Sequence, residues 1–112
     1  MTVTLEQTNG TVVASVRGSI DALTAPDLSE ALDERIAAGH VQMVVDLQGV
    51  EYISSAGLRT ILRSLKRARR DGGDLRLADL QPSVLHVLEL SGFTSILQSF
   101  ESASDAIASF GG

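Results

Sequence analysis

The chain has 112 residues, no cysteine and a formal net charge of −5. This length predicts one domain, and the missing thiols exclude a disulfide scaffold, a thiolate zinc site and a cysteine nucleophile. The acidic balance argues against a duplex nucleic-acid binder, which must neutralise phosphates. We see no secretory signal at the N-terminus, and the longest apolar runs are too short to cross a bilayer, so we expect a cytoplasmic protein without a membrane span.

The first third of the chain predicts a β-hairpin, a helix and a buried strand. Residues 2–6 and 12–16 have strand-like patterns, and Asn9-Gly10 between them suits a type I′ turn. Thr24 is a candidate N-cap for a helix that ends at Ala37-Ala38-Gly39. Residues 41–47 are almost continuously apolar, as expected of a central strand covered on both faces.

The remaining elements alternate between helix and strand. Helical or strand patterns cover 55–70 (helix), 74–78 (strand), 82–90 (helix), 95–100 (strand) and 102–110 (helix). Because consecutive parallel strands require crossover connections, this alternation predicts an α/β fold with a partly parallel sheet and helices packed on it.

The patterns of catalytic and metal-binding residues are weak. His40 and His86 have no metal-ligand spacing, and no phosphate-binding glycine loop is present. A serine hydrolase with Ser55 and His86 is a poor alternative, because Ile53 replaces the first glycine of GxSxG. Asp46 follows a buried-type strand and is best explained as an acid held by backbone N–H groups. We therefore expect no catalytic activity, no cofactor and no metal.

The segment 52–58 carries the strongest functional signal, because it places two serines at the start of a helix. One interpretation is helix capping, which contributes about 1 kcal/mol. The other is that exposed Ser55 is a phosphoacceptor. A phosphate at this position would face unpaired N–H groups and would not unfold the helix. Phosphorylation would then act through a partner surface, by bulk and by about −1.5 to −2 units of charge.

The same helix carries six of the nine basic residues. At 100° per residue, four of them fall in one stripe near Ser55: Arg59, Arg63, Lys66 and Arg70. This stripe is either a solvated face or a docking surface for an acidic partner. Binding of single-stranded nucleic acid is the weaker alternative, because the chain is acidic and has only four aromatic residues.

These motifs together resemble the STAS family, the bacterial anti-sigma factor antagonists, over nearly the whole chain. Residues 44–58 are similar to the family's strand, loop and phosphoacceptor helix, and residues 18–21 resemble its Gly-Glu-hydrophobic-Asp motif. The late turn at 90–93 and the Gly72-Gly73 break also match. The resemblance implies a single STAS domain over residues 1–112, with an N-terminal hairpin, a mixed sheet of four to five strands and about four helices on one side of it.

The resemblance also implies a regulatory cycle. The unphosphorylated antagonist binds an anti-sigma factor, usually a GHKL-type serine kinase, and thereby frees the sigma factor. The kinase phosphorylates the antagonist and ends binding, and a PP2C-type phosphatase restores it. Alignment of the family pattern Asp-Ser-[Ser/Thr]-Gly-Leu on Gly57-Leu58 makes Ser55 the acceptor. Ser54 then replaces the aspartate and is an alternative acceptor, and Ala56 replaces the second hydroxyl residue.

We expect the partner surface to surround this acceptor. Its predicted members are Asp21, Ser54, Ser55, Ala56, Gly57, Arg59 and Arg63. Asp21 is equally well explained as a turn-forming acid. Other members of the family leave two alternative functions open: a non-switching scaffold of the stressosome type, and an accessory subunit of a lipid transporter.

Overall fold

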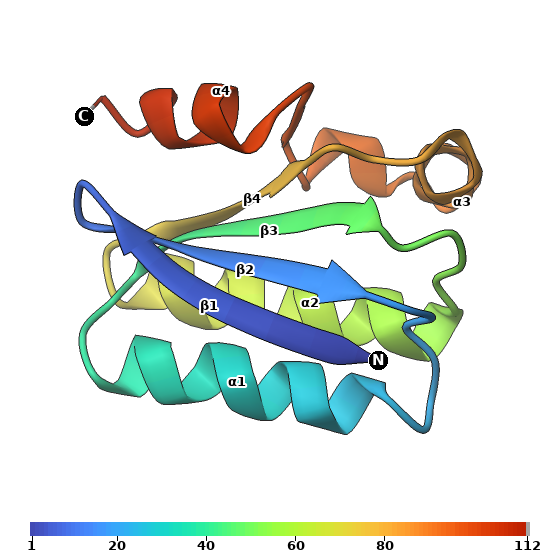
Figure 1. Ribbon diagram of the computed structural model, residues 1–112, viewed down its shortest axis with the longest axis horizontal. Coiled ribbons are helices and arrows are strands. Elements are labelled where there is room, and N and C mark those ends of the chain that lie inside the picture. The colour runs from blue at the N-terminus through green and yellow to red at the C-terminus, as the bar shows by residue number, and fades with distance from the viewer. Residues whose placement is uncertain (112) are drawn as a thin grey trace.

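The computed structural model describes residues 1–111 and contains one five-stranded sheet in the order β1-β2-β3-β4-β5. β1 and β2 pair antiparallel, and each later strand pairs parallel with its neighbour (Figure 1). The strand bounds are β1 Thr2–Thr8, β2 Thr11–Arg17, β3 Gln42–Gly49, β4 Asp74–Ala78 and β5 Ser99–Phe100. The mixed sheet predicted from the sequence is confirmed.

The N-terminal hairpin has the predicted turn. Asn9 and Gly10 both have positive φ angles, 51° and 79°, and Thr8 pairs with Thr11 on either side of them. Two consecutive left-handed residues are what a type I′ turn requires, and its twist matches the twist of the two strands.

Two long helices cover one face of the sheet, α1 (Ala25–Ala37) and α2 (Ser55–Arg70) (Figure 1). α2 spans the residues predicted for it. The apolar stripes of both helices pack against one side of strands β2 to β4 and form the main core. This core includes Val12, Ala14, Leu28, Leu32, Val45, Leu58, Ile61, Leu65 and Leu77. Burial of these stripes fixes the rotation of α2, and so directs its basic residues outward.

The short α-helix α4 (Ala103–Ala108) lies on the opposite face of the sheet (Figure 1). Ala106 packs there with Val13, Val44 and Ala78, whose side chains alternate with those of the main core. The one-sided arrangement implied by the resemblance therefore holds for α1 and α2, and α4 departs from it. The reason is that β3 is apolar on both faces, so Val44 also needs a cover.

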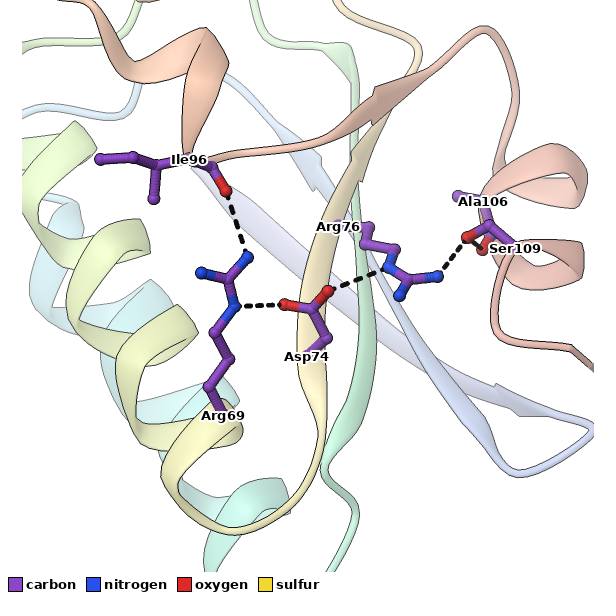
Figure 2. Close-up of polar contacts among 6 residues, drawn as sticks. All are labelled: Arg69, Asp74, Arg76, Ile96, Ala106 and Ser109. Atoms are coloured by element: carbon purple, nitrogen blue, oxygen red, sulfur yellow. Dashed lines mark hydrogen bonds and ion pairs between the residues drawn. The ribbon is translucent and has the colours of Figure 1, made fainter.

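A polar network anchors α4 to the sheet and to α2 (Figure 2). The Arg76 guanidinium lies 3.1 Å from Asp74 Oδ2, donates to Ser109 Oγ at 2.7 Å, and is centred 4.0 Å from the Phe110 ring. From α2, Arg69 Nε donates to the other Asp74 oxygen at 2.9 Å. Burial alone would raise the pKa of Asp74, but the hydrogen bonds from Arg69 and Arg76 outweigh it and hold that pKa below its ordinary value.

The elements after β4 agree with the predictions in part. α3 (Pro82–Leu90) has the predicted bounds, but the strand predicted over 95–100 shrinks to Ser99–Phe100. Residues Phe93–Ser95 instead form a 3₁₀ turn, and Leu97 turns inward to join the main core. The last helix begins at Ala103 because the Ser102 hydroxyl caps it, accepting from Asp105 N at 3.1 Å. Within residues 1–111, no helix has the length and apolar character to span a membrane.

Candidate functional site

The two serines at the start of α2 have different structural roles. Ser54 is the N-cap: its backbone is extended, it is half-buried, and its Oγ accepts from Gly57 N at 3.1 Å. The capping interpretation of the sequence therefore applies to Ser54. Its hydroxyl is committed to the fold, because it satisfies an amide that has no partner inside the helix.

Ser55 is the first residue of α2 and is exposed. Within residues 1–111 its hydroxyl has no hydrogen-bond partner, whereas its carbonyl accepts from Arg59 Nε at 3.5 Å. An exposed hydroxyl without a structural role can be modified without loss of a native contact. The structure thus separates a capping serine from an accessible one at adjacent positions.

The loop between β2 and α1 lies against the start of α2. Ile20 N donates to Tyr52 O at 3.0 Å, and Ile20 O accepts from Ser54 N at 2.8 Å, so the two loops pair as a short parallel bridge. Both loops follow the carboxyl ends of parallel neighbours, β2 and β3. They meet there as one surface, at the edge where α/β folds commonly place their sites.

Asp21 shapes the loop between β2 and α1. Its Oδ1 accepts from the amides of Thr24 and Leu23, at 3.1 and 3.0 Å, and from the Thr24 hydroxyl at 3.2 Å. These hydrogen bonds, led by the one from the Thr24 amide, hold the pKa of Asp21 below its ordinary value. The structure therefore shows Asp21 as a turn-forming acid. Thr24 precedes α1 as predicted, but its hydroxyl serves this turn and does not cap the helix.

The turn held by Asp21 presents Leu23, which sequence reasoning missed. The Leu23 side chain is 89% exposed, the largest exposure of any large apolar residue in residues 1–111. Tyr52, in the neighbouring loop, is 56% exposed. One sequence signal could have identified Leu23: it lies five residues before Leu28, out of phase with the buried stripe of α1. An exposed apolar side chain on an ordered turn is a suitable anchor for a protein partner.

A groove of about 530 Å³ runs between α1 and α2 next to these loops. Arg59 and Arg63 line its α2 wall, and Glu30 and Asp33 line its α1 wall. Asp33 is engaged by Arg67, at 3.7 Å, and by hydroxyl groups. Within the described part of the chain, Arg59, Arg63 and Lys66 have no carboxylate within 4 Å, whereas Arg70 pairs with Asp71 at 3.8 Å. Three cations of the basic stripe are therefore free within residues 1–111: Arg59, one turn from Ser55, and Arg63 and Lys66, eight and eleven residues beyond it.

The structure places all seven predicted site residues at the start of α2, farther along it or in the loop next to it. Ser54, Ser55, Ala56 and Gly57 form the first turn of α2, Arg59 and Arg63 follow along the helix, and Asp21 lies in the adjoining loop. Each predicted role in partner binding stays a prediction.

The other two groups considered for catalysis are Asp46 and His86. Asp46 Oδ1 accepts from Gln48 N at 2.9 Å, as expected for an acid held at a strand end. His86 is exposed on α3, and within residues 1–111 it has no hydrogen bond with Ser55. Over the same residues, His, Asp and Glu form no group of three able to hold a metal ion.

Comparison with known proteins finds relatives of this chain in sequence and in fold. The STAS domain family model matches residues 2–106. BtrV of Bordetella bronchiseptica, a candidate anti-sigma factor antagonist, is 36% identical over 110 residues, which cover 98% of this chain and 95% of BtrV. The crystal structure of an anti-sigma factor antagonist from Mycobacterium paratuberculosis is 27% identical, with a TM-score of 0.87 over 96% of this chain and 92% of that one. Bacillus SpoIIAA in its phosphorylated form shares the fold, with a TM-score of 0.75 at 19% identity over 97% of this chain and 99% of SpoIIAA.

Proposed function

This chain belongs to the STAS domain family, and from that premise we propose that it is an anti-sigma factor antagonist switched by phosphorylation of Ser55. Unphosphorylated, it binds an anti-sigma factor that is a GHKL-type serine kinase, and the sigma factor is released. The observation that carries the proposal is the exposed Ser55 hydroxyl, at the start of the helix that carries Arg59 and Arg63 and next to the loop that presents Leu23. This role would place the chain in the cytoplasm with its partners.

The proposed surface combines apolar and charged contacts. Leu23 supplies the apolar anchor, and Asp21 holds its turn in place. Arg59 and Arg63 favour an acidic partner surface, because complementary charge speeds association and fixes the orientation of the complex. Ala56 adds only a methyl group next to Ser55, so a partner can approach the Ser55 hydroxyl closely, and buried Gly57 holds this turn against the loop at Ile20.

Phosphorylation ends binding through this surface. The Ser55 oxygen attacks the γ-phosphorus of ATP on the kinase, the bond to ADP breaks, and the hydroxyl proton passes to a base of the kinase. The product carries about −1.5 to −2 units of charge at pH 7 where the partner had packed against a neutral hydroxyl. A PP2C-type phosphatase restores Ser55 by hydrolysis, which releases inorganic phosphate. In both steps Ser55 is a substrate residue, and the chain supplies no catalytic group or cofactor.

Ser55 is favoured over Ser54 by the hydrogen bonding at the start of α2. A phosphoryl group on Ser54 would modify the oxygen that accepts the Gly57 amide, and Ser54 is half-buried. A phosphoryl group on Ser55 disturbs no side-chain contact seen in residues 1–111. One structural relative, SpoIIAA, was determined in phosphorylated form, so this fold occurs in a phosphorylated protein.

The test uses the full chain, ATP and each GHKL-type anti-sigma kinase encoded in the same genome, with intact mass and phosphosite mapping as readouts. We expect one phosphoryl group on Ser55, lost in Ser55→Ala and kept in Ser54→Ala. Phosphate on Ser54 would contradict the assignment of the acceptor. If no kinase modifies the chain and partner binding is unaffected by ATP, the non-switching scaffold or the transporter accessory subunit becomes the better description.

The binding step is tested with the kinase that modifies the chain. Ser55→Asp should bind that kinase more weakly than the neutral, similarly sized Ser55→Asn, because only the former adds charge. Equal binding of the two variants and the unmodified chain would contradict a charge-based switch.

A further inference from the structure

The Arg59 side chain lies over the turn that contains Ser55. The two residues are four apart on α2, so their side chains share one face of the helix, with Cβ atoms about 5–6 Å apart. Helical side chains point toward the N-terminus, which brings a long side chain at 59 back toward residue 55. The structure shows this directly, because Arg59 Nε lies 3.5 Å from the Ser55 carbonyl oxygen.

Arg59 has no committed counter-ion in the unphosphorylated protein. Across residues 1–111, no carboxylate lies within 4 Å of its guanidinium, and its contact with the Ser55 carbonyl is long and weak. The acids of the facing helix that line the groove are Glu30 and Asp33, and Asp33 is already engaged by Arg67. The guanidinium is therefore free to move by a small side-chain rotation.

A phosphoryl group on Ser55 would lie within reach of this guanidinium. A negative group four residues before a positive one is the favoured order on a helix, and a guanidinium can bind two phosphate oxygens at once. The Gly57 amide is already bonded to Ser54, and Arg59 is the charged donor whose side chain lies over this turn.

We propose that Arg59 pairs with the phosphoryl group of phosphorylated Ser55. The modification then acts on the partner surface twice: it adds negative charge, and it withdraws the Arg59 cation that the partner uses in the unphosphorylated state. This inference rests on the proposed role of Ser55 as acceptor. It assigns to Arg59 the positioning of the phosphoryl group, beyond its expected contact with the partner.

Arg63 provides a matched control. It is also exposed, free of ion pairs in the described residues and on the same stripe, but it lies eight residues from Ser55, about 12 Å along the helix. Substitution of either arginine by glutamine changes the net charge equally. Only Arg59→Gln should remove a direct pair with the phosphoryl group.

The test uses the full chain with phosphoserine installed at position 55 during translation, so it needs no kinase. ³¹P NMR follows the second ionisation of the phosphoserine as the pH is raised at about 0.1 M ionic strength, where the Debye length of about 10 Å largely screens a charge as distant as that of Arg63. Because Arg59 favours the dianion, Arg59→Gln should raise that pKa by about 0.3 units, Arg59→Lys should keep part of the effect, and Arg63→Gln should leave it nearly unchanged. Added salt should reduce the difference between the wild-type chain and Arg59→Gln.

Two outcomes overturn the pairing: equal pKa values in the wild-type chain and Arg59→Gln, or an equal rise in Arg63→Gln. The result is separate from the kinase experiment. If no kinase modifies Ser55, the proposed function fails while the NMR titration still decides whether the pair forms. If the kinase modifies Ser55 and the titration shows no pair, the switch stands without Arg59.

Discussion

Gly57 and Ile20 approach so closely that a Cβ at position 57 would lie 2.7 Å from Ile20 Cγ2 and 2.8 Å from the Ile20 carbonyl oxygen. Real Cβ contacts are not this short, and the backbone oxygen cannot rotate away. The missing side chain therefore lets the first turn of α2 lie directly on the loop between β2 and α1. This contact is what brings Ser55 beside the turn that carries Leu23.

Gly57→Ala should separate these two loops. We expect a loss of about 1–3 kcal/mol in the free energy of unfolding from urea titration, because the added methyl group overpacks a tight contact. Backbone amide shifts in residues 20–24 should change as well. Ser55→Ala, in the same helical turn and exposed, should stay within about 0.5 kcal/mol of the wild-type chain. Wild-type stability with unchanged shifts in Gly57→Ala would contradict the close approach.

Substitutions of the two serines should have unequal effects on stability. Ser54→Ala removes the acceptor of the Gly57 amide and should cost about 1 kcal/mol in urea unfolding. Ser54→Asp should keep most of that stability, because a carboxylate is also a good N-cap and favours the start of a helix. Ser55→Ala should have little effect. A cost for Ser55→Ala equal to that of Ser54→Ala would show that the cap is wrongly assigned.

Leu23 should matter for partner binding and not for folding. Because the side chain is 89% exposed, Leu23→Ala removes almost no buried contact, and its circular dichroism and melting temperature should be unchanged. Affinity for the anti-sigma factor should fall about tenfold, as for an apolar anchor at the centre of an interface. Leu90→Ala is the control, since Leu90 is 75% exposed on α3. Equal losses in both variants would contradict a specific anchor.

The elements that were predicted well are those with strong local signals. α2 combines a long apolar stripe with a serine at its start and glycines after its end, so its bounds follow from the sequence. The Asn9-Gly10 turn is specified in the same way, by residues that accept positive φ angles. The segment around Ser55 was predictable because its motif lies in a short run of adjacent residues.

The features that were missed depend on tertiary contacts. Nothing local in residues 95–98 shows that Leu97 turns into the core and shortens β5. The position of α4 depends on which face of β3 remains uncovered after α1 and α2 have packed. Leu23 is out of phase with the buried stripe of α1, but its place on an ordered, exposed turn depends on the hydrogen bonds of Asp21. The sequence alone does not show which of these apolar residues and sheet faces is buried, and by which element.

Arg76→Gln should loosen α4 from the sheet. The change removes the ion pair with Asp74 and the contact with the Phe110 ring, and we expect a loss of about 1.5–3 kcal/mol in the free energy of unfolding at pH 7. Since the pKa of Asp74 is lowered in the fold, its contribution is present above the unfolded value of 3.8 and is lost as the pH falls through the folded value. The cost of Arg76→Gln should therefore shrink in acid. Arg63→Gln, which removes an equal charge from a free side chain, should have little effect at either pH.

Asp79 should be a source of instability at neutral pH. It has a left-handed backbone, with φ of 56°, after β4, and burial together with the nearby Asp46 carboxylate raises its pKa above the ordinary value of 3.8. A raised folded pKa means that the fold disfavours the ionised form, so stability increases as the pH falls through the folded pKa toward 3.8. Asp79→Asn removes that charge, and asparagine tolerates the left-handed backbone.

We therefore expect Asp79→Asn to melt at a higher temperature than the wild-type chain at pH 7. The gain should disappear below about pH 3.8, where the wild-type carboxyl is protonated in both states. Glu6→Gln, an equal charge change on exposed β1, controls for net charge and should not reproduce the gain. Asp46→Asn should raise the melting temperature of Asp79→Asn by less than it raises that of the wild-type chain. The reason is that the two carboxylates share one unfavourable interaction, which either substitution removes. A lower melting temperature for Asp79→Asn at pH 7, or a gain that persists in acid, would show that the carboxylate of Asp79 supports the fold by another contact.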